Sequence, residues 1–255
     1  MWEAAFWGLV GGSALVLGAA LGYAVALPQR LIAGVMAIGS GVLISAVAFD
    51  LMDEAFARGG FLATALGFVG GAVAYTAANV YLSRRGAKHR KRSGSDPGQA
   101  QPAAGTEKDG ADTGLAIAVG ALLDGIPESV VIGTSLLAGG GVGAVTVAAV
   151  FLSNVPEGLS SAAGMKRAGR GPAYVFGVWG GIALASGLAA MIGYLALDGA
   201  PPAAVAAVTA IAAGAILAML VDTMIPEATE STHEYSGLIA VIGFLIAFAL
   251  SKLEG

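Results

Sequence analysis

Long apolar segments separated by short polar breaks occupy most of this chain. A helix that crosses a lipid bilayer needs about 20 mostly apolar residues. By that criterion the pattern predicts eight membrane-spanning helices, over residues 5–27, 31–52, 61–82, 114–138, 142–164, 172–196, 203–225 and 236–252. The breaks contain prolines, glycines and charged residues, as at 28–30 and 201–202. We therefore expect an all-α integral membrane protein with eight transmembrane helices.

One polar stretch, residues 83–113, departs from this pattern. It opens with a basic run and continues rich in Gly, Ser, Gln, Pro and Asp. Such a composition has too few apolar groups to bury a core and is typical of a disordered loop. The chain is thus predicted to consist of residues 1–82 with helices 1–3, a loop over 83–113, and residues 114–255 with helices 4–8.

The bulk composition agrees with a membrane protein. Hydrophobic residues make up 56% of the chain and charged residues 12%, whereas soluble domains contain about 25% charged residues. Cysteine is absent, which excludes a disulfide framework, a thiolate metal site and a cysteine nucleophile. Glycines spaced four apart favour close helix packing, and they occur at Gly8/Gly12, Gly18/Gly22, Gly67/Gly71 and Gly177/Gly181.

The basic residues predict how the helices are oriented. Of the 13 Lys and Arg residues, eleven lie in the breaks after the first, third and fifth predicted spans, and the other two are Arg58 and Lys252. Basic loops remain on the cytoplasmic side of a membrane. We therefore expect a multi-pass protein of the cell membrane with the loop 83–113 in the cytoplasm and both termini outside.

Two similar motifs lie near the middle of the fourth and fifth predicted spans. Residues 124–128 read Asp-Gly-Ile-Pro-Glu, and residues 153–157, 29 positions later, read Ser-Asn-Val-Pro-Glu. Proline removes a helical hydrogen bond, so the carbonyl groups of Leu123 and Leu152 lose their usual donors. Freed carbonyls at membrane depth are tolerated where they line a cavity or bind an ion. A pair of packing kinks with neutral acids is the alternative.

These motifs predict a polar metal site between helices 4 and 5. Residues four apart share one helix face, and a carboxylate at the bilayer centre costs at least about 2.5–3.5 kcal/mol. No Lys or Arg lies within either span, so the missing positive charge is most simply a divalent metal ion or protons. The candidate ligands are Asp124, Glu128, Ser153, Asn154 and Glu157.

Two further acids extend a possible pathway for cations. Asp50 is predicted near the outer end of the second span, and Asp222 near the inner end of the seventh. Both still lie within apolar sequence, where an ionisable residue marks a functional site by default. We therefore expect Asp50 and Asp222 to lie along the cation pathway.

At these motifs the chain resembles the ZIP (Zrt/Irt-like protein) family of divalent metal transporters. The family has eight transmembrane helices, with termini outside and a long cytoplasmic loop between helices 3 and 4. Its helix 4 carries a pattern like His-Asn-x-Pro-Glu-Gly and its helix 5 one like His/Gln-Glu/Asp-x-Pro-Glu-Gly, which correspond here to 124–129 and 153–158. A weaker likeness to the family's helix 7 covers 213–227.

The resemblance implies a role for each matching residue. Glu128 and Glu157 fall on the family's metal-binding glutamates, Asp124 takes the place of the helix-4 histidine, and Ser153 that of the helix-5 His or Gln. Three departures imply that the family's two-metal centre is reduced to one site. They are Gly125 in place of an Asn ligand, Asn154 in place of an acid, and the run 186–190 with no helix-6 Glu.

The function implied is transport of a divalent transition-metal cation (Zn, Fe, Mn or Cd) toward the cytoplasm by alternating access, without enzyme activity. The expected partners are the metal cation as substrate and the lipid bilayer, with a homodimer left open and no nucleic acid. An intramembrane hydrolase is an alternative, although the chain has no His-Glu-x-x-His sequence and no mid-membrane Arg for a phosphate. A metal-binding membrane sensor that does not transport is another.

The ligand set predicts which metals the protein carries. All five candidate ligands offer oxygen, and oxygen sites favour Mn, Fe(II) or Mg, whereas zinc and copper gain from imidazole or thiolate. We expect vesicles containing the protein to take up manganese and iron at least as fast as zinc. Zinc uptake far faster than that of the other two metals would contradict the oxygen-site argument.

Overall fold

The computed structural model describes residues 1–84, 107–138, 144–232 and 234–254, and the regular elements among them are helical. The long helices are α1 (Trp2–Ala24), α2 (Gln29–Ala46), α3 (Met52–Leu82), α4 (Glu107–Ser135), α5 (Ala144–Arg167), α6 (Pro172–Leu197), α7 (Pro202–Met219) and α9 (Ser236–Glu254). Shorter segments extend them: the π-helical turns η1 (Val47–Leu51) and η4 (Leu220–Met224), the 3₁₀ turn η3 (Leu136–Ala138), and α8 (Ile225–Thr232).

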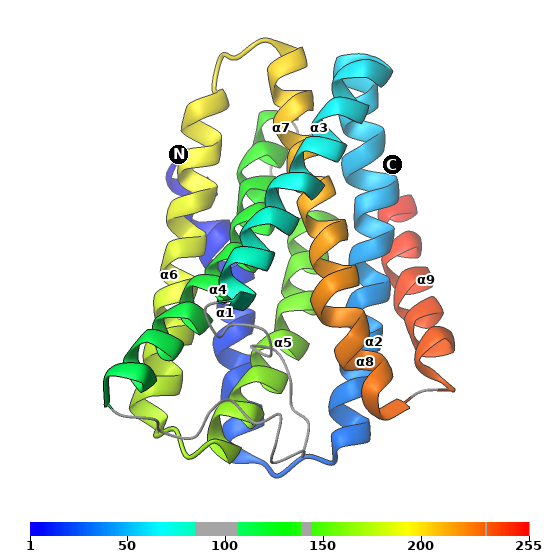
Figure 1. Cartoon of the computed structure of the whole chain (residues 1–255). Coiled ribbons are helices and arrows are strands. Elements are labelled where there is room, and N and C mark those ends of the chain that lie inside the picture. Colours follow the sequence, from blue (N-terminus) through cyan, green and yellow to red (C-terminus); the bar gives the residue numbers. More distant parts are fainter. Residues whose placement is uncertain (85–106, 139–143, 233, 255) are drawn as a thin grey trace.

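The helices form an elongated bundle in which most run along a common axis (Figure 1). The α1–α2 and α5–α6 connections lie at the lower end of the view, and the α2–α3 and α6–α7 connections lie at the upper end. The α5–α6 connection contains Arg170, and the helix turns that flank these two connections contain Arg30, Lys166 and Arg167. The bundle therefore places these basic connections at one end, as the charge pattern predicts.

Helix boundaries differ from the predicted spans at three places. The break expected around 53–60 is helical up to Gly60, whose φ of 69° interrupts a helical path that otherwise runs from Gln29 to Leu82. Residues 107–113 of the predicted loop belong to α4, and most of the rest of that loop lies outside the described residues. The break after Ile225 contains α8. Apolar sequence marks only the part of a helix that lipid can cover, and a helix can extend beyond it.

Several described helices are long and apolar enough to cross a membrane. They are Trp2–Ala24, Gln29–Leu82, Pro172–Leu197 and Pro202–Glu230, and a shorter apolar helix covers Ser236–Lys252. This all-helical architecture is compatible with a membrane-embedded protein. That the chain crosses the membrane eight times remains a prediction.

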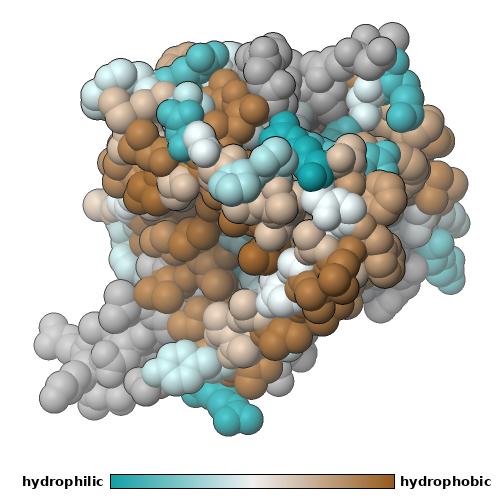
Figure 2. Space-filling model, turned by 90° about the horizontal axis from the view of Figure 1, so that it is seen from above, coloured by the Kyte–Doolittle hydropathy of each residue, from teal (hydrophilic) through white to brown (hydrophobic). Residues whose placement is uncertain are grey.

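The distribution of apolar and polar side chains also fits a membrane environment. Exposed leucines, isoleucines and valines follow the outer faces of α3, α6 and α9, for example Leu62, Leu66, Val69, Val73, Leu184, Leu188, Ile192, Leu238 and Leu245. Figure 2, a view from the upper end, shows hydrophobic side chains over much of the visible surface. Soluble proteins rarely expose apolar patches of this extent, whereas lipid covers them at no cost.

Glycines allow pairs of helices to touch through their backbones. A Cβ atom on Gly71 of α3 would overlap the carbonyl oxygen of Ile211 on α7, and one on Gly214 of α7 would overlap the carbonyl of Phe68 on α3. The α1–α5 contact repeats this arrangement with Gly18. Small residues at interfaces bring membrane helices close enough for extensive van der Waals contact.

The predicted glycine pairs divide into two groups in the structure. The pairs 8/12, 18/22 and 67/71 lie at helix interfaces, where added side chains would meet a neighbouring helix. Gly177 and Gly181 of α6 have open space around them. Spacing alone therefore identified interface glycines in three of the four pairs. The fourth pair has the same spacing, but no neighbouring helix of the described chain packs against it.

The close contact between α3 and α7 predicts a sharp difference between adjacent glycines. Replacing Gly71 by Ala should lower the free energy of unfolding by about 1–3 kcal/mol, because the new methyl group overpacks the interface. Gly70→Ala is the matched control, since nothing lies within 4 Å of its Cβ position. Unfolding titrations in detergent would measure both, and equal stabilities of the two variants would contradict the packing shown here.

Candidate cation site

The α4 half of the predicted site is fully enclosed. Asp124 and Glu128 are 0% and 1% exposed. Leu123 and Val131, on the same side of α4, pack in a hydrophobic cluster with side chains from α2, α3 and α7. The hydroxyl of Tyr75 on α3 donates a hydrogen bond of 2.6 Å to Oδ1 of Asp124. The α4 acids therefore point into the bundle and not toward its apolar surface.

The α5 half is also buried, but its side chains point to different neighbours. Ser153, Asn154 and Glu157 are at most 3% exposed. The Ser153 hydroxyl donates to the carbonyl of Val150 in its own helix at 2.8 Å. Nδ2 of Asn154 donates to the carbonyl of Gly11 on α1 at 3.0 Å, while its buried Oδ1 has no hydrogen-bond partner among the described residues. Asn154 is thus directed toward α1.

The two halves have different main helix neighbours, although α1 contacts both α4 and α5. α4 packs mainly against α6 and α7, and α5 packs mainly against α1 and α2. The hydrophobic contact between α4 and α5 involves Ile132 on one side and Val147 and Val150 on the other. Within the part of the chain that the structure describes, no three acidic or histidine side chains are grouped so that they could hold one metal ion. The predicted ligands are buried in the structure. That they coordinate one cation together remains a prediction.

The two motif prolines lie inside continuous helices. Pro127 is within α4 and Pro156 is within α5. Pro156 fits against α2 at Gly39, where a Cβ atom would lie 2.8 Å from Cγ of the proline and 3.4 Å from Cε of Met224 in η4. Gly39 therefore lets α5 and η4 approach the same point of α2, directly beside the α5 motif.

The two predicted pathway acids each lie in a π-helical turn. Asp50 is in η1 and accepts a 2.6 Å hydrogen bond from the Ser251 hydroxyl on α9. Asp222 is exposed in η4 and accepts a 3.1 Å hydrogen bond from Nδ2 of Asn79 on α3. A π turn inserts an extra residue per turn and re-aims the side chains around it, and such turns often occur at functional sites. The hydropathy pattern predicted that these acids lie within membrane spans, but it could not predict the π-helical turns that hold them.

Glu227 is a buried acid that the site prediction did not include. It is 1% exposed on α8, and its Oε1 accepts a 2.7 Å hydrogen bond from the Ser160 hydroxyl on α5. Burial lowers the pKa of the Arg167 guanidinium at the end of α5, and the charge of Glu227 opposes that shift. The signal in the sequence was a third Pro-Glu pair, since 225–227 repeats the Ile-Pro-Glu of 126–128.

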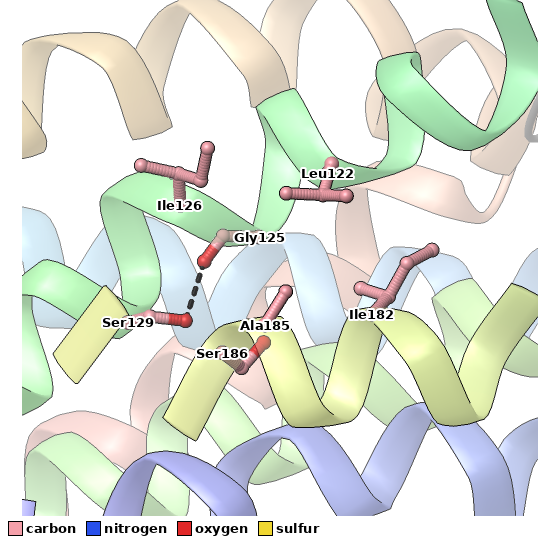
Figure 3. A pocket seen from close by; sticks show the side chains of 7 residues that line it. All are labelled: Leu122, Gly125, Ile126, Ser129, Ile182, Ala185 and Ser186. Carbon is pink, nitrogen blue, oxygen red and sulfur yellow. Dashed lines mark hydrogen bonds between the residues drawn. The ribbon is translucent and has the colours of Figure 1, made fainter. Parts of the chain in front are cut away.

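A shallow hollow lies on a different face of α4 from the acids (Figure 3). It lies between α4 and α6 and is lined by Leu122, Gly125, Ile126, Ser129, Ile182, Ala185 and Ser186. The Ser129 hydroxyl donates to the carbonyl of Gly125 at 2.7 Å, within its own helix. Without a charged group in its lining, this hollow is not part of the acidic site.

A scan against protein-family models and a search of curated proteins give no match to this chain. The likeness to the ZIP family therefore depends on the motifs of the sequence alone.

The bond between Ser160 and Glu227 predicts a stability difference between two buried serines. Ser160→Ala removes a donor from a buried carboxylate and should lower the free energy of unfolding by about 1–3 kcal/mol. Ser40→Ala is the control, because that buried hydroxyl bonds only to the Met36 carbonyl in its own helix. Chemical unfolding of both variants would test this, and an equal or smaller loss for Ser160→Ala would contradict it.

Proposed function

We propose that this protein transports divalent transition-metal cations, with Zn, Fe, Mn or Cd as substrate, across the cell membrane toward the cytoplasm. The observation that carries the proposal is the burial of Asp124, Glu128 and Glu157 inside an apolar helical bundle, each at most 3% exposed. Their predicted spans contain no Lys or Arg. Because charges buried in such surroundings are costly, a transported cation is a natural partner for these carboxylates.

The packing of the two halves supports an alternating-access mechanism. The α4 acids and Glu157 belong to helices whose main neighbours differ, so a change in the separation of these helix groups would assemble or open a cation site that they share. Transporters commonly move one helix bundle against another around a site at mid-membrane. In the proposed orientation both termini are outside and the loop 83–113 is cytoplasmic, so Asp222 and Glu227 would lie on the inner side of that site.

Metal uptake by purified protein in vesicles tests the proposal. Wild-type protein should carry Zn, Mn, Fe or Cd into dye-loaded vesicles, and Glu128→Gln and Glu157→Gln should each slow uptake at least about 30-fold. That estimate follows because truncating one partner of a buried charge pair costs about 2–5 kcal/mol and about 1.4 kcal/mol is tenfold. Glu3→Gln is the matched control, since Glu3 is exposed at the start of α1.

The outcomes separate this proposal from its alternatives. Uptake by the wild type that both α4 and α5 variants retain would place the cation site elsewhere and overturn the assignment. Metal binding without uptake would favour a sensor over a transporter. Absence of both binding and uptake for every metal tested would overturn a metal function altogether.

A further inference from the structure

One face of α3 runs along the interior of the bundle and changes character along its length. After the turn at Gly60, its buried residues are Thr64, Gly67, Gly71, Tyr75 and Asn79, spaced three or four apart. At Gly67 and Gly71 the backbone of α3 lies against α7, and beyond this crossing the two helices diverge (Figure 1). The next two buried positions hold larger polar residues, Tyr75 and Asn79. Their side chains form hydrogen bonds to α4 and to η4.

Tyr75 joins this face to the α4 half of the site. Its side chain is 2% exposed and packs with Met36, Val131 and Ile216 in the central hydrophobic cluster. A tyrosine buried in such surroundings needs a partner for its hydroxyl, and here that partner is Oδ1 of Asp124 at 2.6 Å. The ring is held by packing, so the hydroxyl holds the carboxylate in one orientation.

Asn79 makes a second contact to an acid one helical turn later, although Asp222 is exposed whereas Asp124 is buried. Asn79 is 9% exposed, and its Nδ2 donates to Oδ2 of Asp222 at 3.1 Å. Asp222 belongs to η4, the π-helical turn that follows α7. One face of α3 therefore holds two of the acids expected to line the pathway, and these acids come from two different helices.

We propose that Tyr75 and Asn79 are positioning residues of the cation pathway, which orient Asp124 and Asp222 and make α3 one of its walls. This inference rests on the proposed function. Groups that hydrogen-bond a ligating carboxylate fix its orientation, and their loss typically lowers metal affinity about 10–100-fold. Tyr75 acts through Asp124 in this proposal and does not itself touch the cation.

The first test is Tyr75→Phe, which keeps the buried ring and removes only the hydroxyl. Binding of Mn²⁺ and Zn²⁺ to the detergent-purified full chain should weaken about tenfold or more. Tyr194→Phe on α6 is the control and should bind both metals like wild type. The thermal midpoint of each variant, measured in parallel, reports the folded fraction, so that affinity is compared only between folded proteins.

A double-variant comparison then separates positioning from a structural role. If Tyr75 acts through Asp124, the variant with both Tyr75→Phe and Asp124→Asn should bind metal no more weakly than Asp124→Asn alone. Additive losses, or unchanged affinity in Tyr75→Phe, would overturn the proposal even if the thermal midpoint falls. Asn79→Leu should reduce the rate of uptake in vesicles, and an unchanged rate would remove Asn79 from the pathway.

The proposed function and this inference fail in different ways. If wild-type protein neither binds nor transports any of the metals, the proposed function fails and the inference fails with it. If wild-type protein binds metal and Tyr75→Phe binds it equally well, only the inference about α3 is overturned.

Discussion

Hydrogen bonds from one helix to an acid on another are the interactions on which the interior of this bundle depends. Tyr75 of α3 donates to Asp124 of α4, Asn79 of α3 to Asp222 of η4, Ser160 of α5 to Glu227 of α8, and Ser251 of α9 to Asp50 of η1. Asp124 and Glu227 are buried, and a carboxylate removed from water must find donors or a positive partner within the protein, whereas Asp50 is half-buried and Asp222 is exposed. These four bonds therefore join helices that lie far apart in the sequence.

Such bonds are possible only because the helices approach closely. The glycine contacts of α3 with α7 and of α1 with α5 bring backbones together, which leaves larger side chains such as Tyr75 to fill the space where helices diverge. Along a single face of α3, the small residues allow close backbone contact and the large residues fill the remaining space. The order of Gly67, Gly71, Tyr75 and Asn79 along α3 sets both its contact with α7 and its reach to α4 and η4.

The acids also relate the fold to the proposed function. Asp124, Glu128, Glu157 and Glu227 are enclosed in a body whose outer faces are apolar. Each of the three glutamates follows a proline, and two of the prolines, Pro127 and Pro156, lie inside long helices. Proline weakens helical hydrogen bonding at the level where the carboxylate is buried, which makes these positions suited to a cation that exchanges its ligands as it moves.

The sequence by itself determined the helical architecture and the burial of the acids in spans 4 and 5. Apolar runs of sufficient length predicted helices in the correct places, and the four-residue spacing of Asp124 and Glu128 predicted one buried face. Boundaries were less certain from sequence, because the charged residues between 53 and 60 continue a helix as far as the turn at Gly60. Periodicity reports which residues avoid water and not where a helix ends.

Only the tertiary structure decided which helices meet. Adjacency in sequence suggested a contact between α4 and α5, which the structure contains, but it could not indicate that α4 packs mainly on α6 and α7 and α5 mainly on α1 and α2. In the sequence, Tyr75 and Asn79 are polar residues within an apolar span, and nothing there indicates their partners. The fold places them against Asp124 and Asp222. The physical reason is that a helix sequence specifies a face, whereas the partner of that face depends on packing against helices elsewhere in the chain.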